Sequence, residues 1–181
     1  MDKILFIREF FKNWREVGSI TPSSPFLVNK MLKRVDFENA KIIVELGPGS
    51  GCVTKKILKK MRPDAKLYVF ETNKDFCFKL KQIKDAKLIV CNESALNLSK
   101  RLGDRVVDYI ISGIPLATLQ SKNKNSLLAE GYRVLTPRGY YIQFQYSLES
   151  YKDLNSVFDK VSLGFTPLNI PPAFVYSCLK R

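Results

Sequence analysis

The chain has 181 residues, of which 45% are hydrophobic, and this is enough to bury the core of one domain. No apolar run approaches the roughly 20 residues that a membrane-spanning helix needs. Charged residues interrupt the apolar start of the chain, which argues against a secretory signal. The chain has no His, and its four Cys are far apart in the sequence. We therefore expect a cytoplasmic protein with no metal site and no His acting as a general base.

The net charge of +13 points to an anionic partner. Nucleic acid and anionic lipid are both candidates, because a positive surface attracts either. Residues 55–87 hold eleven Lys or Arg and only four acids. They fall on two expected helices and the strand between them, so a solvated Lys-rich surface is an equally good interpretation.

Residues 3–17 predict an amphipathic helix that extends the domain at its N-terminal end. The apolar half of its helical wheel holds Ile4, Phe6, Ile7, Phe10, Phe11, Trp14 and Val17. The opposite half is polar and charged. Helices of this kind lie in membrane interfaces. We expect residues 3–17 to dock on an anionic membrane surface, with packing against the domain as the alternative.

Apolar strands alternate with helices along the rest of the chain. Strands are expected over 41–46, 66–71, 88–91, 106–112, 139–146, 161–165 and 173–179, and helices over 26–35, 52–61, 74–83, 96–102, 122–135 and 148–161. This alternation predicts a single α/β domain over residues 1–181, with a doubly wound, mostly parallel, seven-stranded sheet covered on both faces. The last two strands lack a crossover helix between them and are expected to pair antiparallel.

A glycine-rich turn follows the first strand and carries the clearest chemical signal. It consists of Glu45, Gly47, Gly49 and Gly51, each separated by one residue. Glycines there let the backbone turn sharply and let a ligand approach closely. A dinucleotide loop would have Gly or Ala where Cys52 stands, and no Gly-Lys-Ser/Thr sequence follows for a nucleotide triphosphate. The acid Glu45 would repel a pyrophosphate but suits a cation such as S-adenosylmethionine (SAM), which carries no phosphate.

A second acid, Glu71, ends the next strand, and Thr72 follows it. A carboxylate at this point can accept both hydroxyls of an adenosine ribose. Together with the glycine-rich turn, this pattern resembles the class I SAM-dependent methyltransferases over nearly the whole chain. The resemblance implies a Rossmann-like sheet, SAM as cofactor, and adenine contacts from the loop after the third strand, at Ser94 and Ala95.

The fourth strand ends in a turn that resembles the bacterial phospholipid N-methyltransferases. The turn consists of Ser112, Gly113, Ile114 and Pro115, followed by Leu116. The stretches 17–24 and 169–173 support the same resemblance. It implies that the four turn residues form the catalytic site, where backbone carbonyls of residues 112–114 orient an amine. Because the chain has no His, we also expect a Tyr hydroxyl near the pocket to assist, with Tyr141, Tyr146 and Tyr176 as candidates.

We therefore expect a SAM-dependent N-methyltransferase that acts on the ethanolamine amine of phospholipids at the inner face of the membrane. No obligate protein partner is expected. An RNA methyltransferase of the rRNA adenine type is the first alternative, although the turn offers no aromatic ring on which a flipped base would stack. A non-catalytic protein that binds SAM or lipid is the second alternative.

Overall fold

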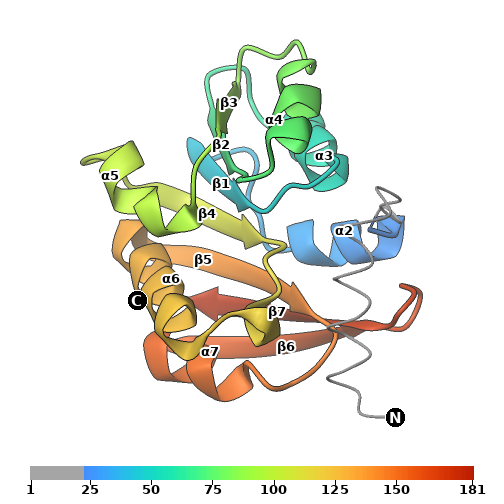
Figure 1. The fold of residues 1–181 in the computed structure, drawn as a ribbon, viewed down its shortest axis with the longest axis vertical. Helices are drawn as coiled ribbons and strands as arrows, with labels where there is room; N and C mark the ends of the chain where they lie inside the picture. Colours follow the sequence, from blue (N-terminus) through green and yellow to red (C-terminus); the bar gives the residue numbers. More distant parts are fainter. Residues whose placement is uncertain (1–22) are drawn as a thin grey trace.

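The computed structural model describes residues 23–181, which form one seven-stranded sheet with helices on both faces (Figure 1). The strands are β1 (Ile42–Leu46), β2 (Lys66–Phe70), β3 (Leu88–Cys91), β4 (Val107–Ser112), β5 (Leu135–Gln145), β6 (Lys160–Thr166) and β7 (Ala173–Leu179). The helices are α2 (Pro25–Leu32), α3 (Cys52–Lys60), α4 (Lys74–Lys81), α5 (Leu98–Leu102), α6 (Ser121–Val134) and α7 (Tyr151–Val157), with single turns η1 (Ala95–Asn97) and η2 (Leu116–Thr118). The expected helix over residues 3–17 lies outside the described residues.

The strand order is β3-β2-β1-β4-β5-β7-β6. Strands β1 to β5 are parallel, and β7 pairs antiparallel with both β5 and β6. The predicted doubly wound sheet and its antiparallel end are therefore confirmed. The strand order reverses between β1 and β4, and open α/β sheets bind their ligands at the carboxyl ends of the strands at such a switch point.

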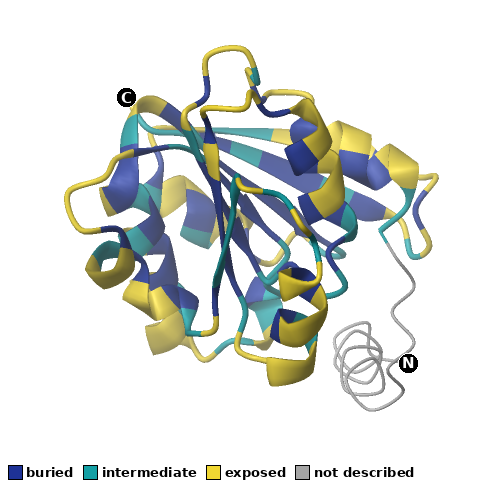
Figure 2. Ribbon diagram, turned by 90° about the horizontal axis from the view of Figure 1, so that it is seen from above, coloured by how far each residue is buried: buried dark blue, intermediate teal, exposed yellow. Residues whose placement is uncertain are grey.

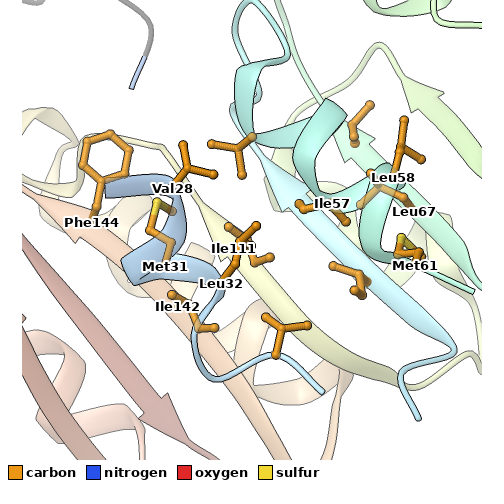
Figure 3. Close-up of a cluster of buried hydrophobic side chains, with 14 of the residues drawn as sticks. Val28, Met31, Leu32, Ile57, Leu58, Met61, Leu67, Ile111, Ile142 and Phe144 are labelled. Atoms are coloured by element: carbon orange, nitrogen blue, oxygen red, sulfur yellow. The ribbon is translucent and has the colours of Figure 1, made fainter. Parts of the chain in front are cut away.

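Two apolar layers hold the helices on the sheet, and the strands between them are buried (Figure 2). On one face, Val28, Met31 and Leu32 of α2 pack near Ile111 and Phe144, beside the side chains of α3 (Figure 3). On the other face, α5, α6 and α7 cover the sheet. Because both faces are covered, strand β1 is a nearly continuous apolar run.

Three predicted elements have wrong boundaries. Helix α2 ends at Leu32, before the predicted residue 35, and α7 is only seven residues long. Strand β5 begins at Leu135, four residues before the predicted start at Gly139. Leu135 pairs with Val107, the register then shifts, and Arg138 adopts a φ of 68° within the irregularity. Pairing with β4 thus extends the strand beyond its predicted start.

Candidate active site

The turn between β1 and α3 is built by three glycines with positive φ. Their φ angles are 66° at Gly47, 53° at Gly49 and 81° at Gly51. Other residues adopt this left-handed region only with strain. A Cβ at Gly49 would meet no atom within 4 Å, whereas a Cβ at Gly51 would lie 2.9 Å from the Leu80 side chain. The middle glycine therefore keeps the loop open, and the last one allows close packing of α3 against α4.

A cavity of about 1090 Å³ lies at the carboxyl ends of the parallel strands, beside this turn. Among the described residues that line it are three acids, Glu45, Glu71 and Glu93, and there is no Lys or Arg. This is the reverse of the charge balance of the whole chain, which is strongly basic. A cavity of this kind suits a cationic ligand and disfavours a phosphate.

Glu45 is the deepest of the three acids and is 3% exposed. Its Oε2 accepts a hydrogen bond of 2.6 Å from Thr54 Oγ1 on α3. Burial raises the pKa of Glu45 from 4.5 to about 8, because a buried carboxylate loses its hydration. The carboxyl is thus largely protonated at neutral pH until a positive charge arrives beside it.

Glu71 follows β2 and reaches across to the glycine turn. Its Oε2 accepts a hydrogen bond of 3.3 Å from the backbone N–H of Gly49, and its Oε1 accepts one of 2.9 Å from Asn73 N–H. Thr72 and Asn73 also line the cavity. The Asn73 side chain accepts hydrogen bonds from Asp75 and Phe76 and so starts helix α4. The two backbone hydrogen bonds therefore hold the Glu71 carboxylate at the cavity wall, where it can accept further hydrogen bonds from ligand hydroxyls.

The loop after β3 forms the next part of the wall. Ser94 and Ala95 line the cavity together with Glu93. The Ser94 hydroxyl accepts a hydrogen bond of 3.2 Å from Leu96 N–H and begins the turn η1. Glu93 is 3.6 Å from the Arg101 guanidinium.

The turn after β4 sits directly against the glycine turn. Gly113 N–H donates to the carbonyl of Leu46 at 2.8 Å, and a Cβ at Gly113 would lie 3.0 Å from the carbonyl oxygen of Gly47. The aromatic ring of Phe144, from β5, is 3.5 Å from the same Cβ position. A side chain at Gly113 would therefore press on the glycine turn as well as on Phe144.

The carbonyl of Ile114, which was expected to orient an amine, faces the sheet. It accepts hydrogen bonds from the side-chain amides of Gln143 at 3.0 Å and Gln145 at 3.1 Å. Both glutamines are buried in β5. They hold the turn in place, and they occupy the Ile114 carbonyl that the prediction had assigned to the substrate.

Most of the predicted site residues share the cavity wall. These are Glu45, Gly47, Gly49, Glu71, Thr72, Ser94, Ala95, Gly113, Ile114 and Pro115. Gly51 and Ser112 are not in the wall: Gly51 packs on Leu80, and Ser112 is fully buried under the turn, where its Oγ accepts a hydrogen bond of 3.3 Å from Ile114 N–H.

The candidate tyrosines lie behind the wall. Tyr141 and Tyr176 are fully buried, with hydroxyls that donate to Gln143 Oε1 and to the Ser147 carbonyl. Tyr146 contacts the Phe144 ring edge to face at 5.7 Å.

Sequence reasoning missed several wall residues, namely Asn73, Phe76, Thr118, Asn123 and Phe144. Asn73 follows Glu71 by two positions and could have been found as part of the same strand end. Phe144 had no such signal, because nothing in its local sequence distinguishes it from an ordinary residue of a buried strand.

Comparisons with known proteins agree with this geometry. The family model described as ribosomal RNA adenine dimethylase matches residues 13–125. An ornithine lipid N-methyltransferase from Singulisphaera acidiphila is 32% identical over 98% of this chain and 95% of its own length. A ribosomal RNA small subunit methyltransferase A from Mycoplasmopsis synoviae is 32% identical over 49% of this chain, which spans 33% of that protein.

Solved structures with little sequence identity share the fold. A SAM-dependent methyltransferase from Aquifex aeolicus has a TM-score of 0.71 at 14% identity, covering 94% of this chain and 98% of that one. Together with the cavity at the switch point, these similarities define a class I SAM-dependent methyltransferase, an enzyme whose cofactor is SAM. Within that class, the chain belongs to the ribosomal RNA adenine dimethylase family.

Proposed function

We propose that this enzyme transfers methyl groups from SAM to the amine of a membrane lipid headgroup, with the ethanolamine amine of phospholipids as the first candidate. The observation that carries this proposal is the similarity to the ornithine lipid N-methyltransferase, because it extends over 98% of the chain. The similarity to the rRNA methyltransferase covers only 49%. We rank the ethanolamine amine first because the turn over residues 112–116 resembles that of the phospholipid N-methyltransferases, and an ornithine lipid amine is the second substrate to test.

The residues at the first three strand ends are suited to hold SAM. Glu71 can accept the two ribose hydroxyls, and Thr72, Ser94 and Ala95 offer contacts around the adenosine. Gly49 leaves room for the ligand at the loop, and Gly47 lets the loop approach Ile114 closely. Glu45 supplies negative charge near the cationic end of SAM. Gly51 packs against Leu80 and so holds the loop against helix α4. When bound, SAM supplies an electrophilic methyl group on a sulfonium.

The turn of Gly113, Ile114 and Pro115 is suited to position the acceptor nitrogen. An alkylamine has a pKa near ~10.4 and is charged at neutral pH, but only the neutral form can attack the methyl carbon. Ile114, Pro115 and Phe144 give this part of the wall an apolar surface. Removal of water there favours the neutral amine, and the fixed turn can hold the nitrogen about 3 Å from the methyl carbon.

Gln143 and Gln145 have a supporting role in this scheme. Their amides hold the Ile114 carbonyl from the sheet side, at 3.0 and 3.1 Å. A loose turn would place the nitrogen out of line with the methyl group, and small displacements lower methyl transfer strongly.

Methylation of rRNA is the second candidate function, and the family model favours it. Phe144 supplies an aromatic ring beside Gly113 that the turn itself lacks, so a flipped base would have a stacking partner. Against this candidate, no Lys or Arg of the described residues lines the cavity to bind the phosphates that flank such a base.

The test is a substrate panel with radiolabelled SAM. Parallel reactions contain vesicles with phosphatidylethanolamine, vesicles with ornithine lipid, or rRNA, at equal enzyme concentration. Label in either lipid and none in rRNA supports the proposal and identifies the headgroup. Label in rRNA with neither lipid labelled would replace it with the second candidate.

A further inference from the structure

The loop between β6 and β7, residues 167–172, exposes two large apolar side chains. Leu168 is 61% exposed and Ile170 is 87% exposed. Asn169 between them is only 3% exposed. Leu168 and Ile170 are called the apolar tip below. Two such side chains close together on one loop are a candidate surface for contact with an apolar partner.

The apolar tip lies at the edge of the sheet where the cavity is found. Gln145, the last residue of β5, pairs with Phe174, and Thr166 pairs with Ala173. The loop therefore begins and ends beside the carboxyl end of β5. Figure 1 shows it on the side toward which the arrowheads of β4 and β5 point, below the first turn of α2.

The buried Asn169 fixes the loop to the cavity wall. Its Oδ1 accepts a hydrogen bond of 3.1 Å from Ser24 N–H, next to Ser23 in the cavity wall. Its side chain also bonds the Tyr146 hydroxyl, which opposes the rise in the pKa of Tyr146 caused by burial. Tyr146 in turn packs on Phe144, which lines the cavity. The apolar tip is thus held at a set position relative to the cavity.

The two segments 161–179 and 23–35 carry charge of the kind that suits an anionic membrane. No charged residue occurs from 161 to 179. The neighbouring segment 23–35 contains Lys30, Lys33 and Arg34 and no acid. The Lys30 side chain lies directly over Gly164 of β6. Apolar side chains that enter the acyl boundary, flanked by cations at the headgroups, are the pattern of interfacial membrane binding.

We propose that Leu168 and Ile170 insert into the lipid bilayer and hold the cavity against the headgroup layer. This role rests on the proposed lipid substrate and adds a membrane contact within the folded domain, separate from the predicted helix over residues 3–17. A headgroup amine could then reach the cavity without the lipid leaving the bilayer, because the cavity wall and the apolar tip are joined through Asn169.

The test compares two double variants that each remove two exposed apolar side chains. Leu168→Ser/Ile170→Ser changes the apolar tip. Phe78→Ser/Val106→Ser is the matched control, because these side chains are 68% and 59% exposed on α4 and just before β4, away from the loop. Binding is measured by co-sedimentation with vesicles of phosphatidylglycerol and phosphatidylethanolamine. We expect the tip variant to bind vesicles at least roughly tenfold more weakly than the wild type, because it no longer buries the apolar area of Leu168 and Ile170 in the bilayer. The control variant should bind as strongly as the wild type.

A tryptophan probe gives an independent measurement. In a Trp14→Phe background, which removes the single natural Trp, the Leu168→Trp variant should shift its emission to the blue on vesicles and be quenched by brominated acyl chains. The KM for vesicular phosphatidylethanolamine should rise in the tip variant, while kcat/KM for a monomeric short-chain analogue should stay unchanged.

Several outcomes would overturn the proposal. One is equal vesicle binding by the tip variant and the wild type, and another is an emission from the Leu168→Trp variant that vesicles do not change. Conversion of a dimer to a monomer at constant vesicle binding would assign the tip to a second copy of the chain. Lower thermal stability or weaker SAM binding in the tip variant would indicate an internal packing role. Vesicle binding needs no methyl transfer, so the two proposals can fail separately. Labelling of rRNA alone in the substrate panel would overturn the proposed function. Loss of vesicle binding in the tip variant would still support the membrane contact.

Discussion

Replacing Glu45 with Gln should change how the stability of the SAM-free protein depends on pH. In the unfolded chain this carboxyl loses its proton near its ordinary pKa of 4.5, but burial in the folded protein raises the pKa to about 8. Between these two values the folded state binds more protons than the unfolded state. The free energy of unfolding therefore falls as the pH rises through this window.

The size of the effect follows from the raised pKa. A difference of one full proton changes the free energy of unfolding by about 1.4 kcal/mol per pH unit. From pH 5.5 to 7.5, the wild type should lose roughly 2 kcal/mol through Glu45. The chain has no His, so the usual source of titration near neutral pH is missing. The side-chain amide introduced by Glu45→Gln cannot ionise and can still accept the hydrogen bond from Thr54, so the variant should show little of this loss.

Urea unfolding at pH 5.5, 6.5 and 7.5, at one ionic strength, measures the slope for both proteins. Parallel pH profiles would refute the conclusion that Glu45 is neutral in the SAM-free protein. A second consequence concerns binding, since the positive charge of SAM should lower the pKa of Glu45 and release its proton. Calorimetry in buffers with different ionisation enthalpies should detect more proton release from the wild type than from Glu45→Gln near pH 7.

Three further predictions concern the cofactor turn and the N-terminal segment. Glu71→Ala should weaken SAM binding roughly tenfold to a hundredfold, the worth of a charge-assisted hydrogen bond, and unchanged affinity by calorimetry would contradict the ribose assignment. Gly51→Ala should lower the thermal unfolding midpoint more than Gly49→Ala, because both have positive φ, which disfavours Ala by about 1–2 kcal/mol, but only the Cβ at Gly51 meets a side chain, at 2.9 Å. Equal shifts would show that the contact relaxes freely. Phe10→Ser with Phe11→Ser should reduce vesicle binding at unchanged SAM affinity, whereas unfolding of this variant would indicate that the predicted helix packs on the domain.

The sequence was sufficient to predict the sheet because its signals are local. Strand β1 is apolar along most of its length, and a glycine turn and helix follow it, so a buried parallel strand is the simplest interpretation. The start of β5 could not be predicted in the same way. Pro137 and Gly139 have the composition of a turn, but Leu135 pairs with Val107 and extends the strand around an irregularity at Arg138. Pairing partners of this kind are distant in sequence and leave no periodic pattern.

The same distinction applies to the site. The places of Glu45 and Glu71 in the cavity wall were predictable, because an acid at the carboxyl end of a parallel strand lies at the ligand-binding edge of the sheet. Gln143 and Gln145 were not, because their contact with Ile114 joins residues 29 and 31 positions apart. That contact also explains the error about the Ile114 carbonyl: a sequence shows that a turn has carbonyl groups, but their direction depends on donors from another strand.

The central claim is that the acid-lined cavity binds SAM and delivers its methyl group to the nitrogen of a lipid headgroup. The most direct measurement is NMR of vesicular phosphatidylethanolamine after reaction with SAM labelled with ¹³C in its methyl group. We predict a ¹³C N-methyl signal on the ethanolamine headgroup with the wild type, and a much weaker signal with Glu71→Ala at a SAM concentration too low to saturate that variant. A headgroup that stays unlabelled under these conditions, while ¹³C appears on adenine in rRNA, would contradict the account.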